Sequence, residues 1–430
     1  MIIFCVEVSI VKTYIPRIMD SLLQEELQAF GGVLLTGPKW CGKTTTAEQI
    51  SQSTLSMQSP DNQEAYLQMA ELTPSLLLEG KNPRLIDEWQ MAPQLWDAVR
   101  HDVDVKGEFG LYILTSSTSV DEKKLKHSGA GRISRLKMYT MSLFESHDSN
   151  GAVSFADLFD DPHSIAARSN CKIEDYANLI VRGGWPGMIG NSEAVNRRQI
   201  AGYCDAIVKS DITTVDGVSR DERKVTSILR SYARHTASQA SKTTILKDFS
   251  QNDESIHINT LESYLSALNK LFVIDDLPAW SPRLRSKTTI RVSDTHHFVD
   301  PAIAAYFLQA SPHDLLFDPN TFGLLFESLV IRDLRVYSQA LRGHLTHYRD
   351  KSGLEADAIM HLSDGRWAAI EVKLGSRQVD EAVENLLALK ERIDTTKTNP
   401  PSFLMIITGT EFAYQRKDGV MVVPLGCLRP

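Results

Sequence analysis

The sequence predicts an α/β protein in which two α/β segments flank a largely helical one. In the first segment, which extends to about residue 148, short apolar runs alternate with stretches that favour helices. Short buried strands of this kind predict a parallel sheet that is covered on both faces. From about 176 to 275, apolar residues recur at helical spacing. From about 318, strand and helix patterns alternate again, which predicts an independent α/β domain.

The composition is that of a globular protein with several domains. The chain has 430 residues, 42% hydrophobic and 23% charged, and at roughly 100–200 residues per domain this predicts two to four domains. The net charge of −8 argues against non-specific coating of nucleic acid, which depends on Lys and Arg, but it is compatible with a local basic face. Five cysteines without a CxxC pair indicate neither a disulfide framework nor a zinc site. No apolar run approaches the roughly 18 residues of a membrane span, so we expect a cytoplasmic protein with no membrane partner.

A phosphate-binding loop is the clearest motif. Residues 37–44 (GPKWCGKT) fit G-x-x-x-x-G-K-[ST]; they follow an apolar run at 33–36 and precede a helix expected from Lys43. Such a loop wraps its N–H groups around a phosphate and adds the positive end of a helix dipole. It predicts a P-loop NTPase domain that binds ATP, with Lys43 on the β- and γ-phosphates and Thr44 on Mg²⁺; the alternative is a glycine-rich turn. The residues expected to bind the nucleotide here are Gly37, Pro38, Lys39, Trp40, Cys41, Gly42, Lys43, Thr44 and Thr45.

Two carboxylates follow the next apolar run, at residues 85–86. Asp87 would hold Mg²⁺, and Glu88 would polarise the attacking water, which separates hydrolysis from binding. Glu88 and Lys43 are therefore the expected catalytic residues of this site. A further run at 111–114 ends in polar residues, of which Ser117 would sense the γ-phosphate or orient the water, unless the segment is an ordinary Ser/Thr turn.

One arginine, Arg132, follows the glycine-rich stretch 128–131. It would contact phosphate within its own chain or act on a neighbouring subunit as an arginine finger. The second role requires a homo-oligomer. A surface arginine without a role is the alternative.

The middle segment has the pattern of a winged helix. Helices are expected at 222–237, near 244–249 and at 259–272, followed by strands at 273–280 and 288–292. The cluster Arg283, Arg285, Lys287 and Arg291 could contact the phosphates of DNA or RNA, although a solvated turn is equally compatible. Residues 149–175, rich in Asp and Ser, are expected to form a polar connector.

The last segment carries an acid–acid–lysine constellation. Its expected elements are a helix at 323–337, strands near 344–348, 355–361 and 367–373, a helix from about 379 to 393, and strands at 402–408 and 420–423. Asp357 and Glu371 would stand on adjacent strands, and Lys373 would share the sheet face of Glu371. Such a set can bind Mg²⁺ and activate water, and Glu327 on the preceding helix would add a carboxylate. This is the D…(D/E)-x-K pattern of restriction-endonuclease-like nucleases; an edge strand with alternating charges, or a nuclease fold without catalysis, are the alternatives.

Together these motifs resemble those of prokaryotic AAA-type ATPases that carry a C-terminal domain of unknown function with a nuclease-like core. The resemblance runs from about Tyr14 to the end and implies an AAA-type domain at 14–148, a helical and winged-helix region at 176–300 and a nuclease-like domain at 318–430. Two positions depart from the family pattern: Lys39 replaces an arginine, and Ser116 replaces a glycine. The further marks of the resemblance are the sequences YIPR at 14–17, IDE at 86–88 with Gln90, AGR at 130–132, RGGWP at 182–186, Gly323 with FE at 326–327, Glu355 with Asp357, and EVK at 371–373.

Three functions follow from these patterns. The first is an Mg²⁺-dependent ATPase that drives a nucleic-acid-directed module. The second is a metal-dependent nuclease gated by ATP. The third is a non-catalytic ATP switch that binds a protein partner and in which the nuclease-like domain is only a platform.

Overall fold

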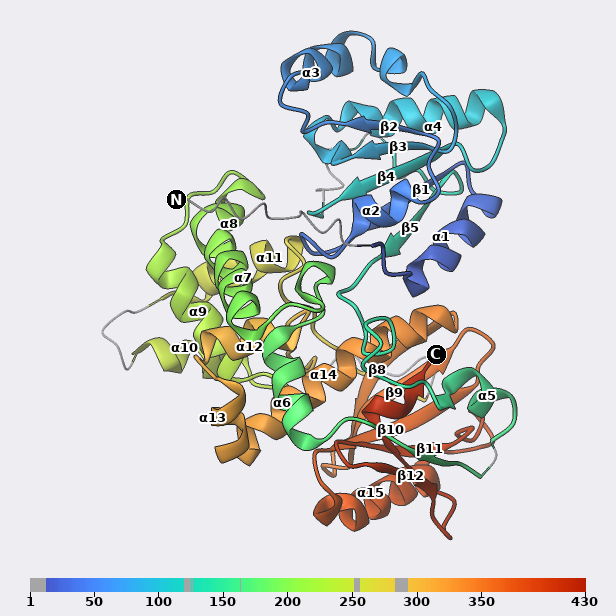
Figure 1. Ribbon diagram of the computed structural model, residues 1–430, viewed down its shortest axis with the longest axis vertical. Coiled ribbons are helices and arrows are strands. Elements are labelled where there is room, and N and C mark those ends of the chain that lie inside the picture. Colours follow the sequence, from blue (N-terminus) through green and yellow to red (C-terminus); the bar gives the residue numbers. More distant parts are fainter. Residues whose placement is uncertain (1–12, 120–124, 126, 163, 251–255, 283–292) are drawn as a thin grey trace, which may run out of the picture.

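The computed structural model describes residues 13–119, 125, 127–162, 164–250, 256–282 and 293–430. Figure 1 shows three parts: an α/β part in blue and cyan, a helical part in green and yellow, and a second α/β part in orange and red. The expected strand at 288–292 and the expected basic cluster of Arg283, Arg285, Lys287 and Arg291 lie outside the described residues. Within the described residues, no helix combines the length and apolar character needed to cross a bilayer.

The first α/β part contains the predicted parallel sheet. Its strands lie in the order β2-β3-β4-β1-β5, and every neighbouring pair is parallel. The strands expected at 33–36, 85–86 and 111–114 are therefore confirmed as β1, β3 and β4. Because all strands run the same way, their carboxyl ends meet at one edge of the sheet. The bounds are β1 Gly32–Thr36, β2 Ser53–Ser56, β3 Arg84–Asp87, β4 Tyr112–Ser116 and β5 Ile133–Lys137.

Both faces of this sheet are covered, as the apolar runs predicted. Successive strand residues point to opposite faces: Leu34 packs in a cluster with side chains of α4, whereas Val33 packs in another with side chains of α1 and α2. The next two strands repeat this division between the two clusters, since Ile86 and Leu114 join the first and Leu85 and Ile113 the second. The helices are α1 Ile18–Ala29, α2 Lys43–Glu48, α3 Gln63–Leu72 and α4 Gln94–Lys106.

The middle part is helical, and the three helices expected there are confirmed as α9, α10 and α11. Helix α9 forms because Val225, Ile228 and Tyr232 occupy one buried stripe and because the Asp221 carboxylate caps Lys224 N–H. The strand expected at 273–280 is wrong, since the chain makes only isolated bridges there, through Ile274, Leu277 and Ala279. The helices are α6 Ile173–Arg182, α7 Glu193–Ala206, α8 Ile212–Thr214, α9 Glu222–Arg234, α10 Lys242–Ser250, α11 Ile258–Lys270, α12 Pro301–Phe307 and α13 Pro312–Phe317.

The last part is a seven-stranded mixed sheet in the order β7-β12-β13-β11-β10-β9-β8. Strands β8, β9 and β10 form an antiparallel meander, and β11 joins β10 in parallel. Helix α14 packs on one face, against Met360 and Ile370, and α15 packs on the other, against Ile359 and Ala369. The bounds are α14 Pro319–Ala340, β8 Gly343–Arg349, β9 Glu355–Leu362, β10 Trp367–Lys373, α15 Val379–Arg392, β11 Leu404–Thr408, β12 Phe412–Gln415, β13 Met421–Pro424 and β14 Leu428–Arg429.

The segment 149–175, expected to be a polar connector, instead contributes one strand to this last sheet and one to a separate two-stranded sheet. Strand β7 (Ala166–Arg168) pairs with β12, and β6 (Val153–Ser154) pairs with β14. Helix α5 (Phe155–Asp160) buries Phe155 and Phe159 against Phe403. The apolar residues at 155, 158 and 159 lie on one helical face between the Asp and Ser residues, and their burial outweighs the polar composition.

Candidate nucleotide site and acidic site

The phosphate loop joins the carboxyl end of β1 to the start of α2. Gly37 and Gly42 have positive φ values of 150° and 103°, and a Cβ on Gly37 would lie 2.2 Å from the Met138 carbonyl oxygen, so this path favours glycine. The ammonium of Lys43 donates to the carbonyl oxygens of Gly37 (3.0 Å) and Pro38 (2.8 Å). A buried lysine therefore lies across the hollow of the loop, where phosphate oxygens could replace these two acceptors.

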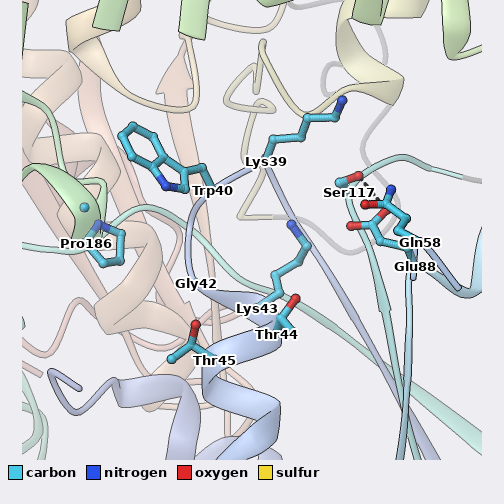
Figure 2. A pocket seen from close by; sticks show the side chains of 11 residues that line it. Lys39, Trp40, Gly42, Lys43, Thr44, Thr45, Gln58, Glu88, Ser117 and Pro186 are labelled. Carbon is cyan, nitrogen blue, oxygen red and sulfur yellow. Dashed lines mark hydrogen bonds between the residues drawn. The ribbon is translucent and has the colours of Figure 1, made fainter. Parts of the chain in front are cut away.

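A cavity of about 460 Å³ opens over the loop, which is within the range of small-molecule sites. In Figure 2, Trp40 and Pro186 lie on one side of Lys43, and Gln58, Glu88 and Ser117 lie on the other. The cavity is lined by Lys39, Trp40, Gly42, Lys43, Thr44, Thr45, Gln58, Glu88, Ser117, Pro186 and Gly187.

The expected magnesium ligands come together at the edge of the sheet. The Thr44 and Thr115 hydroxyls each donate to Asp87 Oδ1 at 2.6 Å. A carboxylate and a hydroxyl next to the phosphate loop are the hard oxygen donors that Mg²⁺ prefers. Thr44 and Asp87 therefore fit the ion, and they would hold it against the β- and γ-phosphates.

Glu88 and Ser117 are also brought together. Ser117 Oγ donates to Glu88 Oε2 at 2.8 Å, and the Gln90 amide donates to the same oxygen. The backbone of Glu88 has a φ of 54°, in the left-handed region that is costly for a side chain of this size, and its N–H donates to Thr115 Oγ1. The carboxylate is thus held by two side-chain donors at the mouth of the cavity.

Arg132 does not join this site within its own chain. Its carbonyl oxygen accepts a hydrogen bond from Gly32 N–H, at the first residue of β1, whereas the phosphate loop follows the last residue of that strand. Its guanidinium is half exposed and pairs with Asp104 at 2.7 Å. A contact between Arg132 and phosphate in the same chain is absent from this arrangement, and a role on a neighbouring subunit stays a prediction.

Several lining residues were not identified as site residues from the sequence. A second cavity of about 410 Å³ continues from Glu88 and Ser117 to Lys270 and Asp216 of the helical part. Pro186 lies in the RGGWP sequence, which was noted without a role, whereas Gln58 and Lys270 stand in no motif. The helical part also contacts the loop directly, since Lys39 Nζ pairs with Asp211 at 2.8 Å and the Trp185 indole donates to the Lys39 carbonyl oxygen at 3.2 Å.

The four residues of the C-terminal constellation lie together. Lys373 Nζ is 2.8 Å from Glu371 Oε2 and 3.8 Å from Asp357 Oδ2, and Asp357 also accepts the Val372 N–H at 2.7 Å. Glu327 lies on α14. Burial and then the nearby Asp357 carboxylate raise the pKa of Glu327 well above its ordinary value. Burial and Asp357 likewise raise the pKa of Glu371.

Lys373 compensates part of the negative charge in this acidic site. Burial opposes its charge, but Asp357 and Glu371 outweigh burial and raise the pKa of Lys373. Within the part of the chain that the structure describes, no three His, Cys, Asp or Glu side chains are grouped closely enough to hold a metal ion as they stand. However, the buried Oε1 of Glu371 has no hydrogen-bond partner. An unpaired carboxylate oxygen is the kind of hard donor that a divalent cation prefers, and a metal role for Glu327, Asp357 and Glu371 stays a prediction.

Comparison with protein-family models divides the chain into three matched stretches. Residues 30–147 match a model described as an AAA domain. Residues 173–314 and 322–428 match two domains of unknown function, DUF8612 and DUF4143. A search of curated proteins finds no match.

Among solved structures, the chain is similar to the Walker-type ATPase PABY2304 of Pyrococcus abyssi, at 13% identity over 68% of this chain and 96% of that one, with a TM-score of 0.41. It also matches a chain in the structure of Drosophila ORC bound to DNA, at 10% identity over 64% of this chain and 88% of that one, with a TM-score of 0.22. The family match and the loop geometry together identify residues 30–147 as an AAA-type P-loop domain.

Proposed function

We propose that the protein is an Mg²⁺-dependent ATP hydrolase. One observation carries this proposal. A single cavity is lined by Lys43, Thr44, Glu88 and Ser117, and Asp87 accepts a hydrogen bond from the Thr44 hydroxyl. The cavity thus brings together a phosphate-binding cation, a pair of magnesium ligands and a carboxylate that can act as a base.

The residues divide the work of hydrolysis between them. Lys43 exchanges the carbonyl oxygens of Gly37 and Pro38 for phosphate oxygens, and the loop N–H groups hold the β-phosphate. Bound Mg²⁺ would neutralise charge on the phosphates. Glu88 accepts a proton from the attacking water, and Ser117 keeps the carboxylate in place through its hydrogen bond.

The binding half of the proposal is tested by Lys43→Ala. Loss of a charged hydrogen-bond donor to phosphate costs about 1.5–3 kcal/mol, so ATP should bind roughly 10- to 150-fold more weakly. The dissociation constant is measured by titration calorimetry in Mg²⁺. The control is Lys351→Ala, at an exposed lysine in the β8–β9 turn, which should bind ATP like the parent. If Lys43→Ala binds ATP as tightly as the parent, ATP does not bind at this loop.

The acidic site supports a second function, metal-dependent cleavage of DNA or RNA. The support comes from Asp357, Glu371 and Lys373 on an antiparallel meander with helices on both faces, the arrangement expected of a restriction-endonuclease-like core. ATP turnover compared with and without single- and double-stranded DNA and RNA would identify the polymer to which hydrolysis is coupled.

The cleavage prediction concerns Asp357→Ala and Lys373→Ala. With labelled DNA and RNA and either Mg²⁺ or Mn²⁺, the parent should cut. Both variants should lose roughly 10²-fold or more of the rate, because Asp357 would hold the metal and Lys373 would stabilise the attacking group. Glu384→Ala is the control, since this residue lies in the same domain, on helix α15, outside the acidic site. If the parent cuts no substrate with either metal and binds ATP with negligible turnover, the non-catalytic switch is favoured instead.

A further inference from the structure

Trp40 is an unusual side chain for its position in the phosphate loop. Its φ is 67°, in the left-handed region. This backbone conformation is unfavourable for a residue with a Cβ but not for glycine. Its indole is 46% exposed, whereas Trp89, Trp96 and Trp185 are buried. The loop therefore carries a large apolar ring at a strained position, with half of its surface left open to solvent.

The open surface of Trp40 faces the nucleotide cavity. Trp40 and Pro186 lie on the side of Lys43 away from Glu88 (Figure 2). The terminal phosphate must approach Glu88 for hydrolysis, so the rest of the nucleotide extends in the opposite direction, towards Trp40. The base of the nucleotide would then arrive at an exposed aromatic ring.

A turn from the helical part completes this end of the cavity. Gly187 lies so close to the indole that an added Cβ would be 2.6 Å from Trp40 Cζ2. The turn is fixed to the loop, because the buried Trp185 donates to the Lys39 carbonyl oxygen. The chain just before the turn is held separately, since Gly184 N–H donates to the buried Asp300 carboxylate at 2.9 Å. The RGGWP sequence thus has a physical role: it places Pro186 and Gly187 beside Trp40.

We propose that Trp40 and the Pro186–Gly187 turn form the seat of the nucleobase, in which the base of the bound nucleoside triphosphate stacks on the indole. This inference rests on the proposed function, since the triphosphate must bind at the loop. Base–aromatic stacking contributes about 1–3 kcal/mol and tolerates different bases, because every base has a π-face. The seat therefore adds affinity for a nucleoside triphosphate and none for the phosphate chain alone.

The test compares ATP with inorganic tripolyphosphate, which has the phosphates but no base. Titration calorimetry in Mg²⁺ should show Trp40→Ala binding ATP roughly 5- to 150-fold more weakly and binding tripolyphosphate as the parent does. Trp40→Phe, which keeps an aromatic face, should recover most of the ATP affinity. Phe109→Ala is the matched control, because this ring is 66% exposed. It lies just before β4, at the amino ends of the strands and therefore away from the phosphate loop at their carboxyl ends.

A second variant tests the seat without removing the indole. Gly187→Ala places a methyl group against Trp40 and should weaken ATP binding while leaving tripolyphosphate binding unchanged. Unaltered ATP affinity in both Trp40→Ala and Gly187→Ala overturns the seat. An equal loss for ATP and tripolyphosphate also overturns it, since Trp40 would then act through the shape of the loop. If the parent binds neither ATP nor tripolyphosphate, the proposed function itself fails. If ATP binding depends on Lys43 but is unchanged by Trp40→Ala, only the nucleobase seat fails.

Discussion

Replacing Glu88 by glutamine is expected to lower kcat for ATP hydrolysis about 10²–10⁴-fold, the usual contribution of a positioned general base. Glutamine keeps the size of the side chain, and its amide oxygen can still accept the Ser117 hydroxyl. It cannot accept a proton from water. ATP binding depends on Lys43 and on the loop N–H groups, so the dissociation constant should change little. Phosphate release under saturating ATP and calorimetric binding of ATP measure the two quantities separately.

The control for Glu88→Gln is Glu71→Gln, which makes the same change on the exposed surface of α3 in the same domain. Its kcat should match that of the parent. Hydrolysis by Glu88→Gln at the parental rate would show that another group activates the water. A loss of ATP affinity that parallels the loss of kcat would show that Glu88 supports binding rather than the chemical step.

The nucleotide site could be predicted largely because its signals are local. The loop at 37–44 follows a strand and begins a helix, and a parallel sheet brings the ends of its strands to one edge. Once β1, β3 and β4 are recognised as parallel, Lys43, Asp87 and Ser117 must lie at the same edge of the sheet. The acidic site could be predicted for the same reason. Asp357 and Glu371 lie on adjacent strands of the meander, and Glu371 and Lys373, two residues apart on one strand, point to the same face of the sheet.

The features that the sequence did not predict depend on contacts between distant segments. The RGGWP sequence shows no local sign that Pro186 lines the nucleotide cavity, since that placement requires the helical part to dock on the phosphate loop. The strand β7 at 166–168 pairs with β12 at 412–415, across most of the chain. Arg132 could not be placed because a glycine-rich turn does not reveal which edge of the sheet it occupies.

One buried ionic cluster links all three parts of the molecule. Arg332, on α14, pairs with Asp333 at 2.7 Å and with Asp300 at 3.4 Å, and all three side chains are at most 1% exposed. Asp300 also accepts hydrogen bonds from Thr140 Oγ1 (2.8 Å) and from Gly184 N–H (2.9 Å). Arg332 is therefore the cation that lies between carboxylates from two parts of the chain in the interior. Buried pairs of this kind are costly to break, because removing one partner leaves the other uncompensated.

Replacing Arg332 by methionine is accordingly expected to lower the free energy of unfolding by about 3–5 kcal/mol, measured by urea titration. Arg377→Ala, an exposed arginine before α15, should stay within about 0.5 kcal/mol of the parent. Burial already raises the pKa of Asp333, and removal of the cation raises it further. A carboxyl whose folded pKa is raised loses stability as the pH rises, so the deficit of Arg332→Met should be smaller at pH 5 than at pH 8. Adding Asp333→Asn should restore part of the stability at pH 8, since the amide needs no counter-charge. A deficit that is independent of pH, and that Asp333→Asn does not reduce, would show that Arg332 stabilises the fold by packing alone.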